Sequence, residues 1–172
     1  MKKIILGLTG LFILASCQQQ KIGFVNNGDV INELQEKKDI EKKFQEKDKA
    51  FQARRDSMVG AFQLEIKEAQ VKSKRMSQED VQALSVEFQQ KEQLLGQKIQ
   101  MEQNQLETAF QTEIDTLIVK VKKHIKGYGK NHGYDFILGT SETAASVLYG
   151  KDANDLTEEI RQELNDSYKS KK

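Results

Sequence analysis

The chain offers few side chains that could carry out chemistry. Cys17 is the only cysteine, so no disulfide can close within the chain. The only histidines, His124 and His132, lie eight positions apart across a glycine-rich stretch, which is unfavourable spacing for a metal site without further ligands. The sequence contains no phosphate loop of the GxxxxGK type and no paired acids on an apolar helix face. We therefore expect no enzyme and no metal or cofactor site.

The first sixteen residues have the features of a signal peptide, with two lysines followed by an apolar run that ends at Leu14 and is too short to cross a bilayer. The segment Leu14-Ala15-Ser16-Cys17 resembles the lipobox of bacterial lipoproteins, in which the chain is cut before a cysteine whose thiol is then diacylated. We expect residues 1–16 to be removed, Cys17 to be lipidated and residues 17–20 to form a short linker to the membrane. The alternative is a plain signal peptide with an incidental cysteine.

The composition favours long solvated helices. Removal of residues 1–16 would leave 25 basic and 26 acidic residues, so no overall basic field would attract nucleic acid. The chain contains no proline and no tryptophan, and it is rich in Gln, Glu and Lys. Such residues form helices readily but supply little for a thick core.

Large apolar residues repeat every eleven positions along the middle of the chain, which keeps them on one face of a helix. The pattern also reflects about residue 75, because residues from the two halves pair so that their position numbers add to 150. This register predicts an antiparallel hairpin of two helices, over about 30–73 and 77–126, whose second helix begins at a capping box of Ser77 and Asp80. The expected seam consists of Ile40, Phe44, Phe51, Phe62, Ile66, Leu84, Phe88, Leu95, Ile99, Leu106, Phe110, Leu117 and Val121, with Arg55 falling opposite Leu95.

The hairpin should project as an arm, because the residues between the apolar stripes are mostly Gln, Lys and Glu. A compact bundle, the alternative, would need a second apolar face. Gly60 and Gly96 interrupt the two helices and are either pivots or tolerated surface residues. Near the tip, basic side chains outnumber acidic ones. They either contact anionic lipid headgroups or acidic protein segments, or are simply solvated side chains at a helix end. These basic residues are Lys67, Lys72, Lys74 and Arg75.

The two ends of the mature chain should form a small body, residues 21–29 and 127–172. We expect three short strands, over 21–26, 134–138 and 146–149, and a short helix that opens at Asp155. The fold class is then α+β. Three strands and one helix enclose little, so we expect partner copies to cover the sheet. The expected core of the body or oligomer is Ile22, Phe24, Val25, Phe136, Ile137, Leu138, Val147, Leu148, Tyr149, Leu156, Ile160 and Leu164.

The order of these segments resembles the Skp/OmpH family of periplasmic chaperones over residues 21–165. The segments that carry the resemblance are Lys21-Ile22-Gly23-Phe24-Val25-Asn26, the hairpin, Gly133-Tyr134-Asp135-Phe136-Ile137-Leu138, Val147-Leu148-Tyr149 and Asp155-Leu156-Thr157-Glu158-Glu159-Ile160. The resemblance implies a trimer with a shared small barrel, and three arms around a cavity that holds unfolded outer-membrane proteins without ATP. Residues 30–125, with seventeen basic and seventeen acidic side chains, depart from the strongly basic character of better-known members.

Two further expectations concern location and a rival function. Gln18 stands where many inner-membrane lipoproteins have aspartate, which favours anchoring in the periplasmic leaflet of the outer membrane. The rival function is a structural or adaptor lipoprotein whose hairpin binds one folded partner in the cell envelope. The range of clients separates the two functions, because a chaperone of this kind should bind many unfolded proteins.

Overall fold

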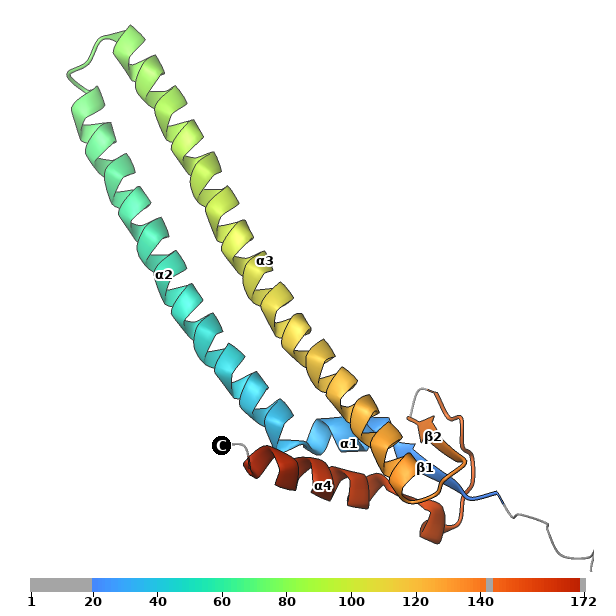
Figure 1. The fold of residues 1–172 in the computed structure, drawn as a ribbon. Helices are drawn as coiled ribbons and strands as arrows, with labels where there is room; N and C mark the ends of the chain where they lie inside the picture. The colour runs from blue at the N-terminus through green and yellow to red at the C-terminus, as the bar shows by residue number, and fades with distance from the viewer. Residues whose placement is uncertain (1–19, 142–143, 171–172) are drawn as a thin grey trace, which may run out of the picture.

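A computed structural model describes residues 20–141 and 144–170 (Figure 1). Residues 1–19, which include the expected signal peptide and Cys17, lie outside these ranges. The elements follow the order β1 (Ile22–Asn26), α1 (Asn27–Glu33), α2 (Gln35–Ser73), α3 (Gln78–Asn131), β2 (Phe136–Thr140), the 3-10 helix η1 (Asp152–Asn154) and α4 (Thr157–Lys169). Helices α2 and α3 form a long antiparallel arm, and the remaining elements gather at one end as a small body (Figure 1). The expected α+β class and projecting hairpin are confirmed.

The two helices of the arm differ in length. Helix α2 has 39 residues and α3 has 54, which correspond to about 58 Å and about 81 Å at 1.5 Å per residue. The additional length of α3 continues past the start of α2 and packs over the strands of the body (Figure 1). One helix therefore connects the tip of the arm directly to the sheet.

The tip is a tight connection from Lys74 to Ser77, as the sequence predicts. Ser77 Oγ accepts a hydrogen bond from the Asp80 backbone N–H at 3.2 Å and donates one to Asp80 Oδ2 at 2.7 Å. Asp80 also lies in the first turn of α3, where the helix dipole favours a negative charge. This cap fixes where α3 begins.

Replacing Ser77 with alanine should destabilise the first turn of α3 by about 1 kcal/mol, because the Asp80 N–H loses its acceptor. Amide hydrogen exchange should accelerate over the tip and stay unchanged in the body, since helix ends open independently of the core. The neighbouring substitution Met76→Ala, which leaves the cap intact, serves as the control. Equal exchange in Ser77→Ala and the parent chain would contradict a role for this cap.

The seam between the helices carries the expected apolar side chains. All thirteen are buried or half-buried. The rings of Phe62 and Phe88 lie 5.9 Å apart, in the predicted pairing. The ring of Phe44 lies 5.3 Å from that of Phe110, and Phe44 also lines a shallow depression together with Leu106, its predicted partner. Its ring contact is therefore with the residue one turn beyond the predicted partner.

Ion pairs along the edges of the seam keep one register. Lys43 Nζ lies 2.6 Å from Glu113 Oε1, Arg54 pairs with Glu102 at 3.5 Å, Lys91 pairs with Glu65 at 3.1 Å, and Lys120 pairs with Glu36. Hydrogen bonds to Glu87 and Glu65 raise the pKa of Lys91. Exposed pairs contribute little stability individually, but a consistent set disfavours sliding of one helix along the other.

The first helix is broken where the sequence predicts a continuous one. Leu34 is extended, with ψ 133°, and it separates α1 from α2. Its side chain is buried in the body, and the N–H of Gln35 donates to Asn165 Oδ1 of α4 at 2.9 Å. Asn165, which is 130 positions away in the sequence, thus caps the start of α2. The prediction of a single helix over 30–73 was wrong, because the cap that starts α2 comes from α4 and is not encoded in the neighbouring sequence.

Helix α3 ends at Asn131, five residues beyond the expected end at 126. Gly129 is buried within it, and a Cβ at that position would lie only 3.2 Å from Ile137 Cδ1, so glycine allows β2 to pack closely against the helix. Gly133 has φ 67°, and the Tyr134 N–H bonds back to the Gly129 carbonyl at 2.9 Å. This Schellman-type end stops the helix, and the earlier glycines do not.

The sheet has two parallel strands, in a register that pairs Ile22 with Phe136 and Asn26 with Thr140. The Asn26 side chain caps α1 by accepting from the backbone of Gly28 and Asp29. The third expected strand, over 146–149, is not formed in the described chain, which instead makes a local turn from Ser146 to the Ala144 carbonyl. An extended segment needs backbone partners, and one copy of the chain does not provide them there.

The core lies where α4 and α1 pack against β1 and the C-terminal part of α3. Of the expected body residues, Val25, Leu156, Ile160 and Leu164 are buried. Sequence inspection missed Val30, Leu34 and Tyr128, and it assigned Leu117 and Val121 only to the seam although they also belong to this core. Burial raises the pKa of the Tyr128 hydroxyl, and a hydrogen bond with Glu159 adds a smaller effect in the same direction. The sequence did not predict this hydrogen bond.

Candidate functional site

Sparse apolar side chains lie on the two outward faces of the arm, one face on each helix, away from the seam. On α3 these are Val86, Leu94 and Met101, and on α2 they are Leu64 and Val71. Each lies between about a third and about half of a turn around its helix from the seam residues. These five side chains are 49–67% exposed. A shallow depression, lined by glutamines together with Met101 and Ala109, follows the same face of α3. We call these five residues the outer stripe.

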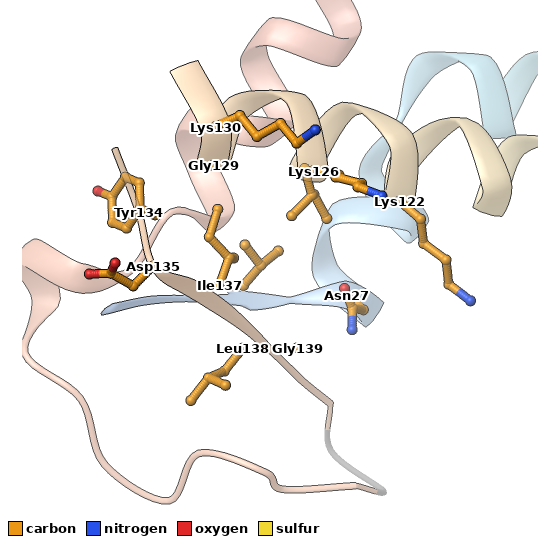
Figure 2. Close-up of a pocket in the computed structure, with 12 residues that line it drawn as sticks. Asn27, Lys122, Lys126, Gly129, Lys130, Tyr134, Asp135, Ile137, Leu138 and Gly139 are labelled. Atoms are coloured by element: carbon orange, nitrogen blue, oxygen red, sulfur yellow. The ribbon is translucent and has the colours of Figure 1, made fainter. Parts of the chain in front are cut away.

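The sheet leaves one apolar face open. Alternate residues of a strand point to opposite faces, so Ile22, Phe24, Phe136 and Leu138 lie on the face turned away from α3. Ile22, Phe136 and Leu138 are 41–55% exposed, whereas Phe24 is half-buried against Gly150. Ile137 points the other way, toward Gly129 (Figure 2). The expected core residues of the sheet are thus divided between a covered and an uncovered face.

The segment 146–149, which leads into Gly150 beside Phe24, carries further apolar side chains. Val147 is half-buried, but Leu148 and Tyr149 are 92% and 86% exposed. They do not belong to the core of a single copy. Their expected place in an oligomer core stays a prediction.

A groove of about 430 Å³ lies between the C-terminal part of α3 and β2 (Figure 2). Lys122, Lys126 and Lys130 line it from the helix, and apolar side chains including Ile125 and Ile137 form its floor. A spacing of four residues places the three lysines on one face of α3. We call them the lysine row.

The sequence contains a signal for the lysine row that was overlooked. Residues 116–134 include no acidic residue, yet they contain five lysines and both histidines. The balanced charge of residues 30–125 concealed this local excess. The other two of the five lysines do not line this groove. Lys120 pairs with Glu36, and Lys123 lies beside α4 near Glu163. The lysine row makes no ion pair within the described residues.

The expected basic tip is exposed. Lys67, Lys72, Lys74 and Arg75 all lie at the surface, and within the described ranges none of them forms an ion pair. A Cβ added at Gly60 or Gly96 would contact nothing within 4 Å, so both positions have room for alanine. Lipid or client binding by the tip and bending at the two glycines stay predictions.

Neither histidine lies in a metal-binding cluster. His132 stacks on Tyr128 with ring centroids 4.0 Å apart, and His124 Nε2 lies 2.9 Å from Glu163 Oε2. Across residues 20–141 and 144–170, no group of three or more potential ligands among His, Cys, Asp and Glu comes together. The same residues contain no helix with both the length and the apolar character needed to span a membrane.

Comparisons with known proteins agree with this geometry. Residues 21–164 match the family model described as outer membrane protein (OmpH-like). The chaperone protein Skp of Vibrio cholerae serotype O1 is 27% identical over 162 residues, covering 88% of this chain and 91% of that protein. A crystal structure of an OmpH-like outer membrane chaperone from Caulobacter crescentus CB15 superposes with a TM-score of 0.74 at 14% identity, covering 86% of this chain and 85% of the other. The long hairpin, the small sheet and the C-terminal helix are therefore those of a member of the Skp/OmpH-like outer membrane chaperone family.

Proposed function

We propose that this protein is an ATP-independent holdase of the periplasm, which binds unfolded outer-membrane proteins between its arms and prevents their aggregation. The observation that carries the proposal is the outer stripe. Five exposed apolar side chains are spread among polar ones over the part of the arm between the tip and Met101. Widely spaced apolar contacts suit an unfolded chain, because they are individually weak and do not require one client shape.

Such clients need protection from one another. An outer-membrane β-strand alternates apolar and polar residues and, before insertion, leaves its backbone groups unpaired. Chains of this kind aggregate readily. An arm that occupies some of their apolar residues, without offering a β-edge of its own, would lower the concentration of aggregation-prone segments.

Oligomerisation, with a trimer as the family implies, would complete the body. A sheet of two strands is marginal by itself, and the face formed by Ile22, Phe136 and Leu138 is open in one copy. Leu148 and Tyr149 extend the apolar surface beside it. Neighbouring copies would bury these side chains, give the segment 146–149 a strand partner and place several arms around one cavity.

A lipid anchor on Cys17 would keep the chaperone at a membrane, with the periplasmic leaflet of the outer membrane as the proposed site. Four residue steps separate Cys17 from Lys21, so the body would remain close to the lipid surface. Clients would then be held near the membrane into which they insert.

Protection of several unrelated porins from aggregation tests the proposed function. The chain from Gln18 onward retains every described residue, and a stoichiometric amount should suppress light scattering when urea-unfolded porins are diluted, without nucleotide. We expect saturation near one trimer per client. The same chain from Gln18 should not protect a control protein that stays folded and precipitates only at its isoelectric point. Failure with every porin would contradict the holdase and favour an adaptor that binds one folded partner.

A further inference from the structure

The lysine row is an uncompensated positive surface at the body end of α3. Lys122, Lys126 and Lys130 are exposed and line one groove. Among the residues that the structure describes, Asp135 is the only acidic residue lining that groove, and its Oδ2 already accepts a hydrogen bond from the Lys21 backbone N–H at 2.8 Å. Three like charges along one helix face repel each other mildly. A multivalent anionic surface would remove that repulsion.

The start of β1 is fixed at the same groove. Lys21 Nζ donates to the His132 carbonyl at 2.9 Å and lies 4.0 Å from the centre of the Tyr134 ring. Tyr134 and Asp135 line the groove together with Lys130 (Figure 2). Any linker that leads into Lys21 therefore enters the body beside the lysine row.

The length of that linker limits the distance to the membrane. Four residue steps separate Cys17 from Lys21, and a fully extended chain spans at most about 14 Å over four residues. Electrostatic attraction at physiological ionic strength extends over about 8 Å. A lipidated Cys17 would thus keep Lys21 within about 14 Å of the acylated thiol, which allows the lysine row to reach the headgroups, whereas the tip lies at the far end of α3 (Figure 1).

We propose that the lysine row binds the anionic headgroups of the phospholipid bilayer that carries the acyl anchor, so that the body lies on the membrane and the arm points away from it. The proposal rests on the proposed lipid anchor, and not on the holdase activity. The apolar side chains of Ile125 and Ile137 line the groove with the lysines and suit the glycerol and upper acyl region of a lipid. A purely polar partner would leave these two side chains without an apolar contact. The orientation leaves the arm free for clients.

The test measures binding to vesicles of phosphatidylcholine with and without phosphatidylglycerol, using the chain from Gln18 so that no acyl chain contributes. The triple substitution Lys122→Gln, Lys126→Gln and Lys130→Gln should weaken binding to anionic vesicles by about a hundredfold, or roughly fivefold for each lysine. The parent chain should bind anionic vesicles less at high salt and should not bind pure phosphatidylcholine.

A matched control removes the same charge from the arm. Lys42, Lys49 and Lys98 are exposed and make no ion pair in the part of the chain that the structure describes, so their triple replacement by glutamine should leave vesicle binding nearly unchanged. Replacing the lysine row by arginine should preserve binding, which separates loss of charge from loss of fold. Equal loss in both glutamine triples, or no loss in either, would overturn the proposal. A changed oligomeric state of the body variant in sedimentation would also overturn it, because the groove would then belong to a second copy.

Orientation gives an independent readout. Asn131→Cys and Met76→Cys each place one thiol, at the body end and at the tip of α3, for an environment-sensitive dye. On anionic vesicles the dye at position 131 should report lipid contact and the dye at 76 should report water; the reverse result would contradict the orientation. Porin protection is measured in parallel and shows whether the holdase activity fails independently of the lysine row. Palmitate labelling of the full chain, with and without Cys17→Ser, shows in the same way whether the lipid anchor fails.

Discussion

Replacing Leu64, Leu94 and Met101 of the outer stripe by glutamine should remove most of the protection that the chaperone gives to unfolded porins. The three side chains are 54–65% exposed, so they can contact a client without any rearrangement of the arm. If each contributes about 1 kcal/mol of apolar contact, their combined loss raises the Kd for a client by roughly a hundredfold. Fluorescence titration with a labelled porin in dilute urea measures the change, and light scattering measures protection.

The arm itself should tolerate these changes. Glutamine forms helices well, and none of the three residues lies in the seam. Helical circular dichroism and its melting curve should match those of the parent chain. A control with Gln63→Ser, Gln89→Ser and Gln93→Ser alters exposed polar residues of the same two helices and should bind porins normally. Undiminished protection by the stripe variant, with the control unchanged, would show that clients are held by another surface.

The largest loss of stability should come from Ile160→Ala in α4. Ile160 is fully buried at the centre of the small core, among residues of β1, α1 and α3. Deleting its side chain removes apolar contacts and leaves a cavity, which should lower the free energy of unfolding by about 2 to 5 kcal/mol. The body contains few buried side chains, so this is a large share of its stability. Urea unfolding followed by circular dichroism, at fixed protein concentration, measures the effect.

Val119→Ala provides the comparison for this experiment. Val119 is 64% exposed on α3, so the same kind of truncation there should change stability by about 0.5 kcal/mol or less. Loss of the body should also loosen the start of α2, because the Gln35 N–H is capped by Asn165 of α4. Amide exchange at Gln35 should therefore rise in Ile160→Ala and not in Val119→Ala. Similar unfolding curves for the two variants would mean that α4 is not part of the cooperative core.

Local patterns in the sequence determined the arm. The eleven-residue repeat placed thirteen apolar residues on facing stripes, and the reflection about residue 75 predicted the turn and the cap at Ser77. These predictions succeed because a helix is held by hydrogen bonds between residues four apart, and because its caps are neighbours in the chain. The balanced charge of the arm could also be counted directly. The lysine row was equally local and could have been found from the absence of acidic residues over 116–134.

Tertiary structure decided the body. The break at Leu34 depends on Asn165 in another helix, and the close packing of α3 against Ile137 of β2 depends on the missing Cβ at Gly129. The segment 146–149 has strand-forming residues but forms no strand in the described chain, because strands require partners for their backbone groups. Neither a distant cap nor a strand partner is encoded by the spacing of nearby residues. The sequence by itself therefore determined an arm built from local contacts, whereas only the folded chain decided how the small sheet, α4 and the lysine row are brought together at its base.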